Sequence, residues 1–430
     1  MSAVMIRCVS AAALLLFSMA AAATDAHNSQ DGASVTLAEA LELSMEHNPE
    51  LVAFGYQLQA QQGRVQQAGF GPAPTLTFLS EDIFGTGGFE VVDVGQTTLT
   101  LSWYFERDKA ERRIDVSSAG VAMLEADAEI KRLDLAAETA RRFLDCLDVQ
   151  AQLQQIDAAV EFAEQMVEAM QARVSAGRSR EAELARSQAQ LARLHLEEED
   201  SEHLLRVSVR RLAALWGEAK PAFTHVAGDF AVLPELVEFT DLVARIDANP
   251  NVARYLNEQR LREAELRLDE AQSKSNWRID VGVRRFEETE DYAMVAGFSL
   301  PLYSKGRNES RKAISRARLA QVEADSTATR LRIETELYTF YEELNHSLHR
   351  AEALREQILP RMEAALADAE RAYAAGRYGY FELSLMQSEV LDVRTELIQA
   401  AIDAHRLVVE IERLAGVTLT DPAIEGRDIK

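Results

Sequence analysis

The sequence predicts a mostly α-helical fold with a small β part, built from duplicated long antiparallel helical hairpins. Two observations predict it. Short motifs recur about halfway along the 430-residue chain, in one order and almost one register. Each half also holds a very long stretch nearly free of proline and glycine, and two shorter stretches in which polar and apolar residues alternate. A chain of this length would otherwise suggest about two or three globular domains.

Four landmarks carry the duplication. Gly177 and Gly376 lie 199 residues apart, and the other pairs of landmarks keep nearly the same separation. The pairs are Asn48-Pro49 and Asn249-Pro250, Ala176-Gly177-Arg178 and Ala375-Gly376-Arg377, Glu183-Leu184 and Glu382-Leu383, and Trp216-Gly217 and Ala415-Gly416. We therefore assign one structural repeat to residues 24–217 and a second to 238–417. Residues 218–237 form an equatorial linker between them, and 418–430 a C-terminal tail.

Residues 1–23 have the pattern of a secretory signal peptide. Arg7 precedes an apolar run, and small residues at 20–23 offer a cleavage site. The run is shorter than the roughly 20 residues that a membrane-spanning helix needs, although a retained anchor is the alternative. Cleavage would remove Cys8 and leave Cys146 alone, so no internal disulfide is possible. The net charge of −24 argues against nucleic-acid binding.

The same elements follow in order in each half. Asn48 and Asn249 are predicted helix N-caps, each with a proline in the first turn, which suits it. Each long helix (107–176 and 307–375) has about 69 residues and would span roughly 100 Å, and Pro360 should kink the second or mark a junction. A return helix follows each, and the second has a coiled-coil seam. Its members are Leu383, Met386, Val390, Val393, Leu397, Ala401, Ala404, Val408 and Ile411.

Four strands are predicted between the helices, at 75–79, 98–105, 277–284 and 292–300. Their alternation gives one apolar and one polar face, with Arg278, Asp280 and Arg284 on the polar face. Aromatic residues near the strand ends would form a membrane-interface girdle. These are Trp103, Tyr104, Trp277 and Tyr303. A soluble hairpin is the alternative for any single segment, but the pattern recurs four times.

The strand number implies assembly. A sheet in lipid must close on itself, and known barrels begin at about eight strands, whereas this chain supplies four. A homotrimer would supply twelve strands, and the three polar-face residues would then line a water-filled lumen.

With these motifs, and with Leu37-Ala38-Glu39-Ala40-Leu41 near the start, the chain resembles the TolC family of outer-membrane efflux proteins from about residue 35 to 419. The resemblance implies a homotrimer in the outer membrane of a Gram-negative bacterium, with a 12-stranded β-barrel in the lipid and a hollow α-barrel across the periplasm. It implies a passive duct without a cofactor. Its partners would be a periplasmic adaptor protein, an inner-membrane pump of the RND type and outer-membrane lipid.

The resemblance also assigns site residues at the two periplasmic tips. The adaptor would dock on Ala176, Gly177, Arg178, Leu184, Ala375, Gly376, Arg377 and Leu383. Glu183 and Glu382 would narrow the closed entrance, and Tyr373 matches an aromatic position that helps to hold it closed.

The cargo is indicated only by a subgroup likeness. Gly71 to Leu76, Glu81-Asp82 and the glycine-rich loop that follows resemble the heavy-metal cation efflux subgroup. That subgroup often has Gly-Lys-Arg after the second strand, where this chain has Glu106-Arg107-Asp108-Lys109; Lys305-Gly306-Arg307 in the second half is closer. Ducts for drugs or for type I secretion share the same fold and stay open as alternatives.

Other protein classes fit less well. No phosphate loop, serine elbow or His-Glu-x-x-His motif indicates an enzyme. Glu343, His346 and His349, or His195, Glu199 and His203, could form metal-binding helix faces, but so much surrounding charge favours solvated surface. A structural coiled-coil envelope protein is the main alternative. A periplasmic adaptor would need a single hairpin between β-rich halves.

Overall fold

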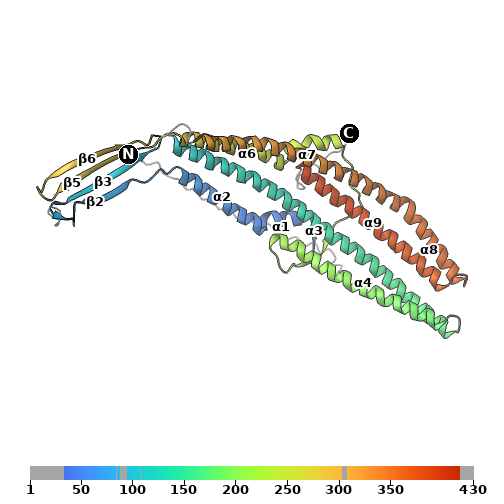
Figure 1. Cartoon of the computed structure of the whole chain (residues 1–430). Coiled ribbons are helices and arrows are strands. Elements are labelled where there is room, and N and C mark those ends of the chain that lie inside the picture. The colour runs from blue at the N-terminus through green and yellow to red at the C-terminus, as the bar shows by residue number, and fades with distance from the viewer. Residues whose placement is uncertain (1–32, 84, 88–93, 107, 303–307, 417–430) are drawn as a thin grey trace, which may run out of the picture. The chain divides into compact units, whose positions relative to one another are not determined.

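The computed structural model describes residues 33–83, 85–87, 94–106, 108–302 and 308–416 (Figure 1). The predicted signal peptide, Tyr303 and the C-terminal tail lie outside the described residues. Within the described ranges, no helix is long and apolar enough to cross a membrane.

The helices confirm the predicted order. Their bounds are α1 Leu37–His47, α2 Pro49–Ala68, α3 Lys109–Ser175, α4 Glu181–Ala213, α5 Phe239–Arg245, α6 Pro250–Gln272, α7 Glu309–Ala353, α8 Leu359–Ala374 and α9 Tyr380–Ala415. α3 is continuous over 67 residues, whereas its counterpart is divided by a π-helical turn, Leu354–Ile358, between α7 and α8. Pro360 stands in the first turn of α8. Because proline removes a backbone donor and crowds the preceding turn, it accounts for this junction.

A four-stranded antiparallel sheet has the order β2-β3-β5-β6, side by side in Figure 1. Its strands are β2 Thr75–Glu81, β3 Gln96–Phe105, β5 Trp277–Phe286 and β6 Tyr292–Ser299, as the alternation predicts. Two further strands, β1 Ala33–Thr36 and β4 Phe223–Ala227, pair in parallel and were not predicted. β4 falls within the predicted linker, which therefore has structure of its own.

The helices beside this sheet repeat its order. α2 packs on α3, where Gln61 Nε2 donates to the Ser117 carbonyl at 3.0 Å. α3 packs on α6, which packs in turn on α7. β2 follows α2, β3 leads into α3, β5 follows α6 and β6 precedes α7. Within the described residues, the edge strands of the sheet are β2 and β6, and the outer helices of this layer are α2 and α7.

The core lies between the long helices. Five seam positions of α9 are buried, and the remaining seam residues are half-buried. The buried five are Leu383, Val390, Ala401, Ala404 and Ile411. A larger core cluster joins α3, α4 and α9 to β4 through Phe143, Leu212, Trp216 and Ile402. Buried alanines are frequent in it, which lets the helices approach closely.

The duplicated Asn-Pro and Gly landmarks meet in space. Asn48 Oδ1 accepts from the Glu50 amide at 2.9 Å, and its Nδ2 donates to the Leu215 carbonyl at 2.7 Å. In the second repeat, Asn249 is fully buried, caps α6 at the Asn251 amide at 2.7 Å and donates to the Leu414 carbonyl at 2.5 Å. Each asparagine thus joins the beginning of one helix to the end of another.

Candidate functional site

The two predicted tip turns have the same backbone geometry. Gly177 has φ 69° and Gly376 has φ 72°, a region that glycine adopts without strain. The amides of Arg178 and Arg377 each donate at 2.8 Å to a carbonyl five residues back, and each glycine amide bonds to the carbonyl three residues back. This is the Schellman ending of a helix. A Cβ on either glycine would have no atom within 4 Å, so conformation rather than crowding explains the residue.

Two arginines of the first hairpin (α3–α4) hold aromatic residues of the second (α8–α9) near these turns. The Arg173 guanidinium lies over the Tyr373 ring, 4.1 Å from its centroid, and donates to the Tyr373 carbonyl at 3.3 Å. Arg186 lies over the Phe381 ring at 4.7 Å. Tyr373 is buried and its hydroxyl has no hydrogen-bond partner among the described residues. The hairpins are therefore joined at the tips by two cation–π contacts.

The predicted tip residues gather at these turns, but with different exposures. Arg178 and Arg377 are exposed, as are Ala176 and Ala375, whereas Leu383 is buried and Leu184 packs beside it. Glu382 is exposed and accepts from the Gly379 amide at 3.0 Å, so it caps α9. Glu183 is half-buried in the first turn of α4. One chain thus brings the predicted tip residues together around the two turns.

The tips also differ in chemistry, which the sequence reasoning missed. Tyr378, Phe381 and Leu385 are 48 %, 52 % and 45 % exposed on the second tip. At the equivalent offset the first tip has Ser179, Ala182 and Arg186. Aligning the two repeats residue by residue would have shown this apolar second tip.

The polar face of the sheet carries charges that are paired with one another. Arg278 Nε lies 3.1 Å from an Asp280 carboxylate oxygen, and Ser102 Oγ donates to that carboxylate at 2.5 Å. Arg284 Nε donates to Thr98 Oγ1 at 2.9 Å, and its guanidinium lies 3.5 Å from Glu81. The three predicted polar-face residues thus share one face of β5. The charge of each arginine there is balanced by a carboxylate, Asp280 for Arg278 and Glu81 for Arg284.

The opposite face of the sheet is apolar and uncovered. Phe78, Met294 and Phe298 are 70 %, 81 % and 66 % exposed. Trp277 stacks on Phe105 at 4.3 Å, at the end of the sheet that joins the helices. Soluble proteins seldom leave such a face open, whereas lipid would cover it.

Of the predicted girdle, Trp103 and Trp277 lie on this apolar face. The assignment of Tyr104 was wrong, because alternation turns it to the polar face, where Arg278 lies 5.9 Å above its ring.

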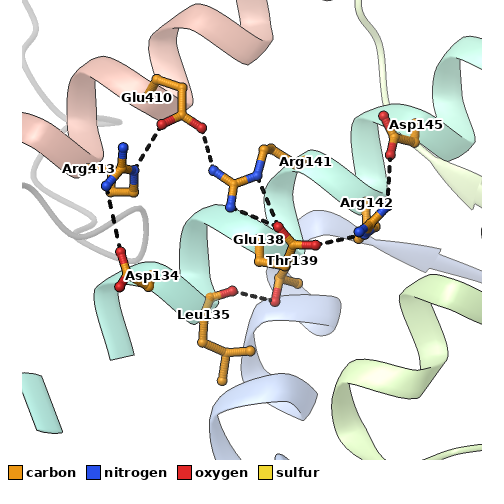
Figure 2. A network of polar contacts seen from close by, with 9 residues as sticks. All are labelled: Asp134, Leu135, Glu138, Thr139, Arg141, Arg142, Asp145, Glu410 and Arg413. Carbon is orange, nitrogen blue, oxygen red and sulfur yellow. Dashed lines mark hydrogen bonds and ion pairs between the residues drawn. The ribbon is translucent and has the colours of Figure 1, made fainter. Parts of the chain in front are cut away.

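An ion-pair ladder joins the two repeats along α3 and α9 (Figure 2). Arg141 bonds both Glu138 and Glu410, and Arg413 lies 3.7 Å from Asp134. Burial disfavours the charge of Arg141, but the hydrogen bonds and charges of its two carboxylate partners outweigh this and raise its pKa. The ladder contributes to holding the repeats in register.

One carboxylate oxygen near the ladder, Glu412 Oε2, is buried and has no hydrogen-bond partner within the part of the chain that the structure describes. Burial raises the pKa of this side chain to about 7.

The remaining candidates for chemistry are surface or core residues. No group of three or more His, Cys, Asp or Glu side chains could hold a metal ion within the described ranges. His195 instead contacts Glu198 at 3.1 Å on an exposed helix face. Cys146 is fully buried, and burial raises the pKa of its thiol to about 11, so it is a poor nucleophile or ligand.

Comparison with known proteins finds a matching family and a similar sequence. The family model described as outer membrane efflux protein matches residues 40–218 and 278–417. CzcC, a cobalt-zinc-cadmium resistance protein of Cupriavidus metallidurans, is 24 % identical over 384 residues, which are 89 % of this chain and 90 % of that protein.

Solved structures share the fold. The outer membrane protein VceC from Vibrio cholerae matches with a TM-score of 0.69 and 18 % identity, over 89 % of this chain and 96 % of that one. CusC, whose structures concern folding and transmembrane channel formation, matches with a TM-score of 0.73 and 12 % identity, over 89 % and 92 %.

Proposed function

Because this chain belongs to the outer membrane efflux protein family, we propose that three copies assemble into an exit duct through the outer membrane. One observation supports the assembly above all. The β2-β3-β5-β6 sheet has an exposed apolar face, a charge-paired polar face and two open edges. An open edge is not tolerated in lipid, so the sheet needs neighbours on both sides.

Closure by identical copies accounts for both edges. If β6 of one copy pairs with β2 of the next, three copies give a closed, even-numbered barrel of twelve strands, with the apolar face towards lipid and the polar face towards water. The pairing is head-to-tail and closes a ring. Arg278, Asp280 and Arg284 would then line the lumen.

The duct works with partners. A periplasmic adaptor would dock on the tip turns around Gly177 and Gly376 and couple the duct to an inner-membrane pump of the RND type. The exposed arginines and the apolar second tip offer a docking surface of mixed character. The pump supplies the energy, and the duct itself is passive.

The proposed cargo is divalent metal cations. The likeness to CzcC extends over 89 % of this chain, and that protein's name refers to cobalt, zinc and cadmium resistance. No metal site within the duct is needed, since a conduit must release what enters it. Drug efflux and type I secretion remain the competing cargoes.

Deleting the gene tests this function. The deletion should raise zinc, cobalt or cadmium accumulation in the host cell, and the wild-type gene should restore efflux. A Gly376→Arg variant should reach the outer membrane and form the oligomer but fail to restore efflux. Unchanged metal tolerance, with increased sensitivity to organic compounds, would contradict the cargo while leaving the duct in place.

A further inference from the structure

The apolar face of the β2-β3-β5-β6 sheet ends in a row of polar side chains. At the end of the sheet away from the helices, the strand register places one polar residue of each strand side by side on this face. These residues are Ser80, Thr97, Arg285 and Tyr292. The next row towards the helices is apolar and consists of Phe78, Leu99, Val283 and Met294. Among the described strands, Arg285 is the one charged residue on this face.

The polar row lies near the outer surface of the membrane if Trp277 lies near the inner one. Trp277 and Arg285 are eight residues apart on β5, which is about 26 Å along an extended strand. A strand tilt of about 40° reduces this to roughly 20 Å along the membrane normal, and the apolar band of outer-membrane barrels is about 25 Å tall. A charged side chain that faces lipid costs far less near an interface than at the midplane. The row is therefore at the height of the lipid headgroups.

The side chains of this row have hydrogen-bond donors that the chain does not use. Arg285 Nη2 lies 3.0 Å from a carboxylate oxygen of Glu287, but Arg285 Nε is buried and has no hydrogen-bond partner among the described residues. The hydroxyls of Ser80, Thr97 and Tyr292 have no partner there either, and Tyr292 is 69 % exposed. A guanidinium beside three hydroxyls can donate several hydrogen bonds to one group of oxygen atoms.

The charges around the row indicate from which side an anion approaches it. The hairpin turn beyond the row is acidic, with Glu287, Glu288, Glu290 and Asp291. Arg284, the neighbour of Arg285, lies on the opposite face of the sheet, 3.5 Å from Glu81. An anion in the water outside would be repelled by the acidic turn. An anion that approaches along the apolar face instead meets Arg285.

We propose that this row binds the phosphate group of an outer-leaflet lipid. Arg285 supplies the charge, because guanidinium groups match the oxygens of phosphate, and the three hydroxyls supply further donors. The inference rests on the proposed function, since the apolar face meets lipid only when the sheet lies in the outer membrane. The acyl chains of the same lipid would then cover the apolar row around Phe78 and Met294.

Native mass spectrometry of the full-length protein, delipidated and then titrated with lipid A, tests the site. Arg285→Gln should weaken lipid A binding roughly tenfold, which is the loss expected for one charge-assisted hydrogen bond. Arg285→Lys retains the charge and should lose less. Tyr292→Phe, a change at an exposed side chain, should give a smaller loss. The matched control is Arg284→Gln, which removes the same charge at the same height from the opposite face and should bind lipid A like the wild type.

The same titration separates the possible failures. Unchanged affinity in both Arg285→Gln and Tyr292→Phe, or an equal loss in Arg284→Gln, would overturn the lipid site. Inorganic phosphate at millimolar concentration should not displace lipid A; displacement would indicate a site for free phosphate and overturn the lipid assignment. The spectra also give the oligomeric mass. A three-chain species with either of these failures leaves the duct in place, whereas a one-chain species would overturn the site together with the proposed function.

Discussion

Arg173→Ala should loosen the contact between the two hairpins at the tips. The wild-type guanidinium lies 4.1 Å from the Tyr373 ring and donates to the Tyr373 carbonyl at 3.3 Å. A cation–π contact at a half-buried site contributes about 1 kcal/mol, and the long hydrogen bond contributes about 1 kcal/mol more. Losing about 2 kcal/mol shifts the equilibrium between joined and separated hairpins by roughly 30-fold.

The assay is single-channel recording in planar bilayers. The wild-type protein should show a small conductance, because we expect its entrance to rest closed. Arg173→Ala should increase the open probability or the conductance, and Arg173→Lys should have an intermediate effect because it keeps the charge but not the planar fork. Arg186→Ala, which removes the longer contact to Phe381, should have a smaller effect. If Arg173→Ala leaves every conductance parameter unchanged in a correctly assembled protein, the tip contact does not control the entrance.

Three further changes give distinct outcomes. Asn249→Ala should lower the free energy of unfolding by about 2–4 kcal/mol, because it removes a helix cap and leaves the buried Leu414 carbonyl without its donor. Asn249→Asp retains the oxygen that caps the helix but loses the amide that donates to Leu414. A denaturant titration in which Asn249→Ala has no effect would refute this role of Asn249. Glu412 retains its proton up to about pH 7 when folded and loses it near pH 4.5 when unfolded, so stability falls as pH rises between these values. Glu412→Gln should therefore stabilise the folded protein by about 1–2 kcal/mol more at pH 8 than at pH 5, a magnitude reduced for the partial exposure of the side chain. Melting temperatures that the substitution raises equally at both pH values would contradict this. Glu382→Gln preserves an acceptor for the Gly379 amide while removing the charge, so it should weaken cation preference measured by reversal potential; unchanged selectivity would exclude Glu382 from the constriction.

Periodicity predicted most of the fold. The alternation of polar and apolar residues located the four strands of the sheet. The near absence of proline and glycine predicted a helix from residue 107, and α3 begins about two residues later, at Lys109, which is the usual precision of such bounds. Pro360 predicted a junction, and the π-helical turn before it confirms that. These features depend on residues close together in the chain, so they can be read from short segments of the sequence.

Contacts between distant segments were harder to predict. β1 and β4 have four and five residues, too few to show alternation, and the residues that pair between them lie 190 or 191 positions apart in the sequence. The Arg173–Tyr373 contact joins the two repeats, and no motif spacing indicates it. Tyr104 was predicted for the girdle because it lies near a strand end, but the alternation of the strand turns it to the polar face.

The tip assignments remain predictions for a physical reason. The structure brings Gly177, Gly376 and their arginines into equivalent turns, but a constriction and a docking surface depend on other chains. Tyr378 and Phe381 are exposed beside these turns and are therefore available to a partner.

Recording from purified protein in a planar bilayer, with its oligomeric mass measured on the same sample, tests the central claim most directly. Because four strands with two open edges cannot close in lipid alone, the account predicts a three-chain mass and discrete single-channel steps. A stable one-chain species, or a three-chain species that never conducts even with Arg173→Ala, would contradict it.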